Sequence, residues 1–145
     1  MTTVRQLLAD KGRAIYSVEP AAPVLEAVRL MAEHHVGALL VMSGAVLNGI
    51  VSERDYARKV ILLGRSSADT PVRDIMSSPV RFVRPNQTTD ECMALMTERR
   101  MRHLPVMQDE KLIGMISIGD LVKNIMLEQK QTIQHLEGYI RGEAT

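Results

Sequence analysis

The chain has few aromatic side chains and only one thiol. Its 145 residues contain no tryptophan, one phenylalanine, three tyrosines and a single cysteine. One cysteine excludes an intrachain disulfide and a multi-cysteine metal cluster, and it suits a reducing compartment. The scarcity of aromatic side chains disfavours single-stranded nucleic-acid binding, which depends on base stacking.

Excess charge and long apolar runs are also missing. There are 18 Lys and Arg against 17 Asp and Glu, a net charge of +1, which provides no global field for nucleic acid or an anionic membrane. The longest apolar stretches, such as 38–42, fall far short of the roughly 20 residues of a membrane span. The first ten residues lack the apolar region of a secretion signal. We therefore expect a cytoplasmic protein with neither nucleic acid nor membrane as a partner.

The chain contains an internal repeat of two similar units. Residues 15–60 align with residues 80–125 at an offset of 65 without a gap, and 13 of the 46 positions are identical. Two copies suggest a pseudo-twofold pair, because a solenoid needs three or more repeats to bury a continuous core. The remaining length leaves no room for a catalytic domain, so we do not expect an enzyme.

Each copy reads in the order strand, helix, strand, strand, helix. We therefore predict an α/β fold of the α+β type, built from two β-α-β-β-α repeats and a long C-terminal helix. The expected elements are 15–18, 23–34, 39–42, 47–51 and a helix from Ser52 in the first copy, and 80–83, 88–100, 104–107, 112–116 and a helix from Ser117 in the second. The expected domain ranges are 1–66 for the first repeat with an N-terminal lead-in, 67–126 for the second repeat and 127–145 for a C-terminal helical extension.

The predicted last helix continues well past the repeat. Apolar residues recur along it by three and four, which predicts an interaction stripe with one polar member. We expect this stripe to meet a second subunit in a homodimer, with packing against its own module as the alternative. The residues of the stripe are Val122, Ile125, Gln129, Ile133, Leu136 and Ile140.

Two fragments of the same pattern, Gly-Ile-Val-Ser-Glu-Arg-Asp at 49–55 and Gly-Met-Ile-Ser-Ile-Gly-Asp at 114–120, carry the most chemistry. A serine that opens a helix can hold a phosphate with its hydroxyl and the free N–H groups of the first turn. An aspartate three residues later can accept both hydroxyls of a ribose. The alternative is that each Ser and Asp form only a capping box.

The repeat, these fragments and Arg-His-Leu-Pro-Val at 102–106 resemble a tandem CBS-domain pair, or Bateman module, over about residues 4–126. The resemblance implies a stand-alone, energy-sensing regulatory module. It would bind an adenine nucleotide (AMP, NAD(H) or ATP) in the cleft between the repeats and signal in trans to a protein target by conformational change. No catalytic cofactor is implied. The alternative is a structural or adaptor homodimer whose Ser and Asp are only helix caps.

The resemblance also assigns roles to individual residues. In nucleotide-binding CBS pairs the equivalent Asp holds ribose, the Ser lies near phosphate, and backbone of the first strand and of the segment before the second strand edges the adenine. The implied ribose ligands are Asp55 and Asp120, the implied phosphate neighbours are Ser52 and Ser117, and the implied adenine slots involve Tyr16 and Ala38 in the first copy and Arg81, His103 and Pro105 in the second.

Charge differs between the two copies at these positions. Arg54 in the first motif corresponds to Gly119 in the second, and Arg102-His103 corresponds to Gly37-Ala38. We expect Arg54, Arg102 and His103 to face phosphate and the two sites to be unequal, one suiting AMP and the other a longer ligand.

Three other candidates have simpler interpretations. The adjacent His34 and His35 point apart on a helix, so a helix-end role is favoured over a metal site. Cys92 falls on an apolar helix face and is expected in the core. Lys59 is expected to be a surface charge.

Overall fold

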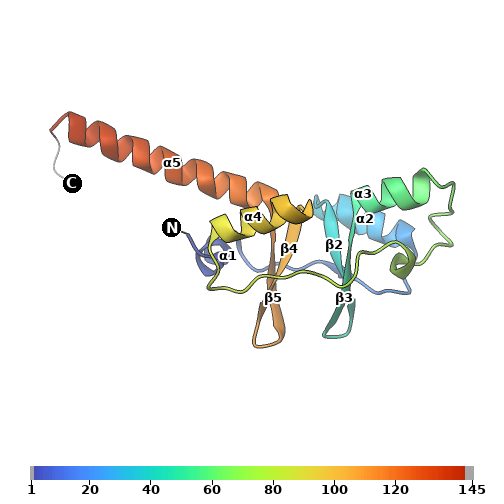
Figure 1. Cartoon of the computed structure of the whole chain (residues 1–145). Coiled ribbons are helices and arrows are strands. Elements are labelled where there is room, and N and C mark those ends of the chain that lie inside the picture. Colours follow the sequence, from blue (N-terminus) through green and yellow to red (C-terminus); the bar gives the residue numbers. More distant parts are fainter. Residues whose placement is uncertain (1, 143–145) are drawn as a thin grey trace.

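The computed structural model describes residues 2–142 and has a mixed α/β architecture (Figure 1). Two similar units lie side by side, and a long C-terminal helix projects away from them. The fold class predicted from the repeat is therefore confirmed. The first unit contains β1 (Ser17–Val18), α2 (Val24–His34), β2 (Ala38–Ser43), β3 (Val46–Ser52), α3 (Glu53–Tyr56) and the π-helical η1 (Ala57–Ile61), and the second contains α4 (Thr89–Arg99), β4 (His103–Gln108), β5 (Lys111–Ser117) and α5 (Ile118–Ile140).

The two β-hairpins have the same internal register. Ala38 pairs with Ser52 in the antiparallel pair β2–β3, and His103 pairs with Ser117 in β4–β5. Each hairpin carries an irregularity at the equivalent position, after Val41 in the first and after Val106 in the second. The shared register places each motif serine opposite the first residue of the preceding strand.

The expected first strand differs between the units. In the first unit β1 runs parallel to β2, and the Leu40 N–H donates to the Tyr16 carbonyl at 3.1 Å. In the second unit the strand expected at 80–83 is reduced to a single parallel bridge between Val83 and Val106. The residue equivalent to Leu40 is Pro105, which has no N–H to donate, so the ladder ends there.

The segment that precedes each unit in the chain, its lead-in, contains a short helix and packs in the core of the other unit. α1 (Val4–Lys11) places Leu7 and Leu8 in the buried core of the second unit, whereas η2 (Val72–Asp74), a 3₁₀ helix, lies in the core of the first with Ile75. The predicted domain ranges describe sequence order and stay a prediction. In space, each core takes its lead-in from the part of the chain that precedes the other unit.

The glycine of each motif allows its lead-in to pack closely. A methyl group added to Gly114 would lie 2.8 Å from Cδ2 of Leu8, and one added to Gly49 would lie 2.7 Å from Sδ of Met76 and 2.8 Å from the Ser77 carbonyl oxygen. Real Cβ atoms do not approach this closely, so only glycine fits both places without a shift.

α5 begins on the second unit and then leaves it. Leu121 is fully buried in the second core, and Ile125 is half-buried on the same face one turn later. Beyond Glu128 the described helix residues are exposed except Gly138. The predicted extension from 127 thus continues α5, while residues 143–145 lie outside the described part. Within residues 2–142, no helix has the length and apolar character needed to cross a membrane.

Candidate functional site

Both motifs form a strand-to-helix turn closed by a capping box. Ser52 is extended (φ −125°) and its hydroxyl accepts from the Asp55 N–H at 3.1 Å, while the Ser52 N–H donates to Asp55 Oδ2 at 3.0 Å. Ser117 and Asp120 repeat this exchange at 3.2 and 2.8 Å. The helix caps weighed as the simpler interpretation are therefore present in both units. They fix each carboxylate against the start of its helix.

The residue before each hairpin completes the turn from the other side. The Gly37 carbonyl accepts from the Glu53 N–H at 3.0 Å, and the Arg102 carbonyl accepts from the Ile118 N–H at 2.8 Å. Two N–H groups of each first turn are thus already paired within the chain. The expectation that free amides of this turn hold a phosphate therefore does not apply to those two groups.

Each carboxylate also contacts a lysine. Asp55 Oδ1 lies 3.2 Å from Lys59 Nζ, which also donates to the Ile75 carbonyl at 2.9 Å. Lys59 is half-buried, so its assignment as a simple surface charge is corrected: it joins α3–η1 to the lead-in of its own core. The spacing of four residues from Asp55 was the sequence signal for this pair.

The lysine at Asp120 comes from the lead-in helix α1. Lys11 Nζ lies 2.6 Å from Asp120 Oδ2 and donates to the Met115 carbonyl at 2.7 Å. Burial alone would raise the pKa of Asp120, but the Lys11 ammonium and the Ser117 hydrogen bonds outweigh it and lower that pKa below its usual value. Asp120 is therefore held as a carboxylate, by a residue that the sequence did not single out.

His103 lies at the boundary between the two units. A methyl group on Gly37 in the first unit would be 3.7 Å from Cε1 of the His103 ring in the second. Burial lowers the pKa of His103, the Asp120 charge opposes this, and the charges of Lys11 and Arg102 reinforce it. Burial thus favours the neutral imidazole, which can offer a phosphate a hydrogen bond but no charge.

The remaining predicted site residues differ in accessibility. Ala38 and Pro105 are buried, Arg54 is half-buried, and Arg81 and Arg102 are exposed. The register brings Ala38 beside Ser52 and His103 beside Ser117, as a shared site would require.

The ring of Tyr16 already has an aromatic neighbour. It stacks on His34 with centroids 3.9 Å apart and an interplanar angle of 13°. This contact gives His34 a structural role at the end of α2, as expected. Cys92 is fully buried in the second core, also as expected.

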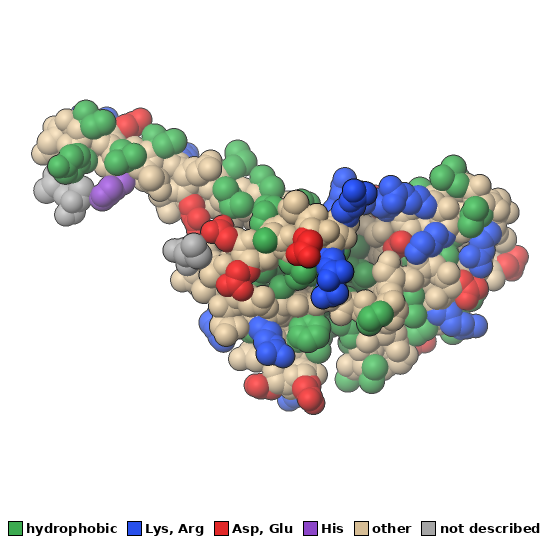
Figure 2. All heavy atoms as spheres, in the orientation of Figure 1, with side chains coloured by type: hydrophobic (Ala, Val, Ile, Leu, Met, Phe, Trp, Pro, Cys, Tyr) green, Lys and Arg blue, Asp and Glu red, His purple; other side chains and the backbone are tan. Residues whose placement is uncertain are grey.

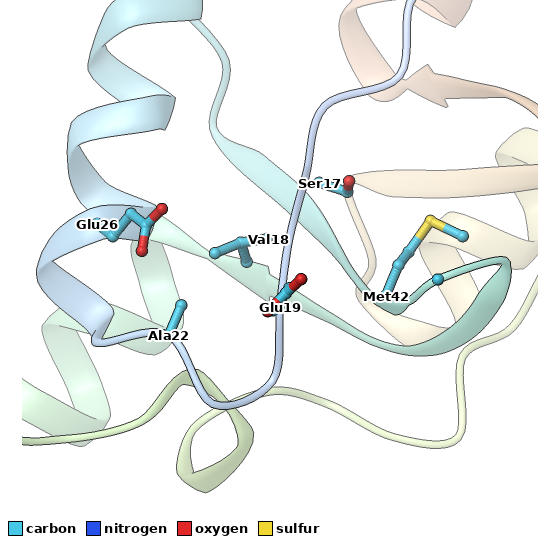
Figure 3. A pocket seen from close by; sticks show the side chains of 7 residues that line it. Ser17, Val18, Glu19, Ala22, Glu26 and Met42 are labelled. Atoms are coloured by element: carbon cyan, nitrogen blue, oxygen red, sulfur yellow. The ribbon is translucent and has the colours of Figure 1, made fainter.

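A separate cavity of about 560 Å³ opens at the other end of the first sheet (Figure 3). It lies beside β1 and the turn after β2, and none of the predicted site residues lines it. The carboxylates of Glu19 and Glu26 border it, which disfavours an anionic ligand there. Its walls are Ser17, Val18, Glu19, Ala22, Glu26, Met42 and Gly44.

Comparison with known protein families matches residues 5–61 and 72–127 to the CBS domain. The mitochondrial CBS domain-containing protein CBSX3 of Arabidopsis thaliana is 39% identical over 97% of this chain and 73% of its own length. A protein with CBS domains from Burkholderia ambifaria MC40-6 has a solved structure with a TM-score of 0.85. It is 59% identical and covers 88% of this chain and 96% of its own.

Two more distant structures carry information on ligands and assembly. The CBS domain pair of MJ0100, solved in complex with 5′-methylthioadenosine and S-adenosyl-L-methionine, shares the fold with a TM-score of 0.78 at 18% identity, over 88% of this chain and 98% of its own. A hexameric CBS-CP12 protein from bloom-forming cyanobacteria has a TM-score of 0.75 at 28% identity, over 84% of this chain and 71% of its own. Proteins with this fold thus include adenosyl-ligand binders and oligomers.

Proposed function

Because this chain belongs to the CBS-domain family, whose members of this kind are generally regulatory and non-catalytic, we propose that it is an adenine-nucleotide sensor. The resemblance drawn from the two motifs is confirmed at the level of the family. The proposed ligand is AMP, NAD(H) or ATP, bound between the repeats. Its binding would shift the arrangement of the two units, and a protein target in trans would respond.

The observation that carries the proposal is the pair of equivalent turns. Each presents a carboxylate that is fixed by its cap yet reachable, because the side chains of Asp55 and Asp120 remain 14% and 24% exposed. Two acceptor oxygens on one carboxylate match the two vicinal hydroxyls of a ribose. Asp55 and Asp120 are therefore the proposed ribose ligands.

The lysine beside each carboxylate gives the ligand's phosphate a counter-charge. When the ribose hydroxyls donate to the carboxylate, Lys59 or Lys11 can turn from Asp to the phosphate and pair with its charge. The proposed phosphate neighbours are Ser52, Ser117, Arg54, Arg102 and His103, and the proposed adenine slots are edged by Tyr16, Ala38, Arg81 and Pro105.

The two proposed sites are unequal. The first has the half-buried Arg54, whereas the second has the exposed Arg102 and a His103 whose pKa is lowered by burial. A half-buried guanidinium has less room to move, which suits a compact phosphate such as that of AMP. A mobile one at the rim suits the longer reach of NAD(H) or ATP. We further propose a cytoplasmic homodimer as the working form.

Isothermal titration calorimetry with AMP, ATP and NADH tests the nucleotide proposal. Asp55→Asn and Asp120→Asn keep an oxygen acceptor for the cap but remove the charge and one ribose acceptor. We expect each to weaken binding at its own site by about tenfold to a hundredfold, since charge-assisted hydrogen bonds are the stronger ones. The exposed Asp10→Asn is the matched control and should change nothing.

The same titration separates the alternative. If the unmodified protein binds none of the three nucleotides, or if both Asn variants bind as it does while melting normally, the Ser and Asp are caps only. The chain would then be a structural or adaptor homodimer. Two identical, independent sites would contradict the proposed inequality.

A further inference from the structure

The two units without the free part of α5 are called the body of the protein. Where α5 extends past the body, one of its faces stays apolar and another becomes polar. The face toward the second unit begins with Leu121 and Ile125 and continues with Glu128, Thr132 and His135, so it becomes polar where the body ends. The contact between the side chains of Thr2 and Glu128 lies at this end of the body. A second face, about 100° further round the helix, stays apolar to the last turn although its apolar side chains are exposed.

This outer face, the α5 seam, has regular spacing. Its residues follow one another by four and three without interruption, which is the heptad pattern of helices that pair side by side. Met126 is 64% and Ile140 82% exposed, and the other apolar members are exposed as well. Ile125, assigned to the stripe from sequence, lies half-buried on the inner face, and Met126 takes its place. The seam consists of Val122, Met126, Gln129, Ile133, Leu136 and Ile140.

Apolar side chains cover much of this helix in Figure 2. A shallow depression of about 700 Å³ runs along its first half, between the seam and the lysines Lys123 and Lys130. Knobs from a second helix need such a hollow beside an apolar ridge.

We propose that the α5 seam pairs antiparallel with the α5 seam of a second copy of this chain. The register that pairs every seam residue sets Val122 opposite Ile140, Met126 opposite Leu136 and Gln129 opposite Ile133. In this arrangement the two bodies lie at opposite ends of the paired helices. The inference rests on the proposed homodimer but not on nucleotide binding.

Charge favours this register over one neighbour, and apolar pairing favours it over the other. It places Lys123 of each helix beside Glu137 of the other, which gives two opposite-charge contacts and one Lys130–Lys130 contact at the centre. A shift by one heptad toward the bodies sets Lys123 beside Lys130 twice, and a shift the other way leaves Val122 and Met126 unpaired. A parallel pair would set Lys130 beside Ile125 and Glu137 beside Thr132, without opposite-charge contacts.

Disulfide trapping tests the geometry. Met126→Cys and Leu136→Cys are made separately, and the two full-length variants are mixed under reducing conditions and then oxidised. We expect a disulfide only between the two different variants, because the antiparallel register sets these positions opposite each other. Two copies of the same variant would hold their cysteines about 15 Å apart, at about 1.5 Å per residue, beyond disulfide reach. Native Cys92 is buried and does not compete.

Charge reversal tests the register independently. Lys123→Glu and Glu137→Lys each turn two attractive contacts into repulsive ones, and each should weaken dimerisation about tenfold in analytical ultracentrifugation. The double variant should restore it. Gln131→Glu, on the far side of the helix from the seam, is the control and should have no effect.

The outcomes separate this inference from the homodimer on which it rests. A dimer that forms no mixed disulfide, or whose affinity ignores both charge reversals, overturns the α5 pairing while the homodimer stands. Disulfides within each single variant would show parallel pairing and also overturn it. A monomer at all concentrations overturns both.

Discussion

At the scale of single residues, the contact between Lys11 and Asp120 combines stability with the candidate site. The pKa of Asp120 lies below its ordinary value of 3.8, so the folded state holds the proton less tightly than the unfolded chain. The stability gained from this is complete above the unfolded pKa. It is lost as the pH falls through the lowered, folded pKa.

We predict that Lys11→Met raises the pKa of Asp120 and lowers stability at neutral pH by about 1 kcal/mol, a shift of about 2–4 °C in Tm. The difference from the unmodified protein should vanish in acid, where Asp120 is protonated in both. Carboxyl ¹³C titration and thermal melts at several pH values measure the two effects. Lys111→Met, at an exposed site on β5, is the control. An unchanged Asp120 titration would contradict the pair.

The two lysines show which parts of the site a sequence can indicate. Lys59 stands four residues after Asp55 on one helix, so the pair was readable from spacing. Lys11 stands 109 residues before Asp120 in the chain, and no local rule connects them. Pairing of a lead-in with the opposite unit is a tertiary effect, and only the fold reveals it.

At the scale of elements, the two motif glycines differ in what they pack against: Gly114 faces only side-chain atoms, whereas Gly49 also faces a backbone atom. The space beside Gly114 is filled by the end of the Leu8 side chain, whose methyl groups can shift more easily than backbone. The space beside Gly49 is filled partly by the Ser77 carbonyl oxygen, which belongs to the backbone. The same added methyl group therefore meets a soft neighbour in one unit and a hard one in the other.

We predict that Gly49→Ala costs about 1–3 kcal/mol of stability and that Gly114→Ala costs less, from overpacking. Urea denaturation measures both. Leu8→Ala alone should cost about 2–5 kcal/mol because it empties part of the second core, and Gly114→Ala in that background should cost nothing further. A Gly114→Ala variant less stable than Gly49→Ala would contradict this assignment.

Most elements could be predicted because their signals are local. The hairpin strands are apolar runs bounded by turn residues, and each second helix starts at the Ser with an Asp three positions on. The strand expected at 80–83 is reduced to a single bridge, and the cause lies in its partner strand rather than in its own residues. Its partner position is Pro105, which lacks the N–H that Leu40 supplies in the first unit.

At the scale of the whole molecule, the crossed lead-ins connect the two cores. Neither core is complete without a segment that the chain routes past the other unit. A mutation that destabilises one core should therefore also destabilise the other, because each core contains a segment that is covalently joined to the other unit. The fold should behave as one cooperative unit.

We predict that Ile75→Ala, which opens the first core, lowers the unfolding midpoint of both units equally. Tyrosine fluorescence reports chiefly on the first unit, which contains Tyr16 and Tyr56. Thiol labelling of Cys92, whose pKa burial raises to about 11, reports on the second. The two midpoints should coincide in urea. Separate midpoints for the two probes would show that the units unfold independently.

The exchange of lead-ins between the two cores also suggests how the chain could have evolved. A single half-length unit, with its own lead-in helix, sheet and closing helix, would complete both cores if two copies traded their first helices. That trade is domain swapping between identical chains. The present polypeptide has the arrangement of such a swapped dimer joined into one chain, so duplication of a half-length gene would produce it without new contacts.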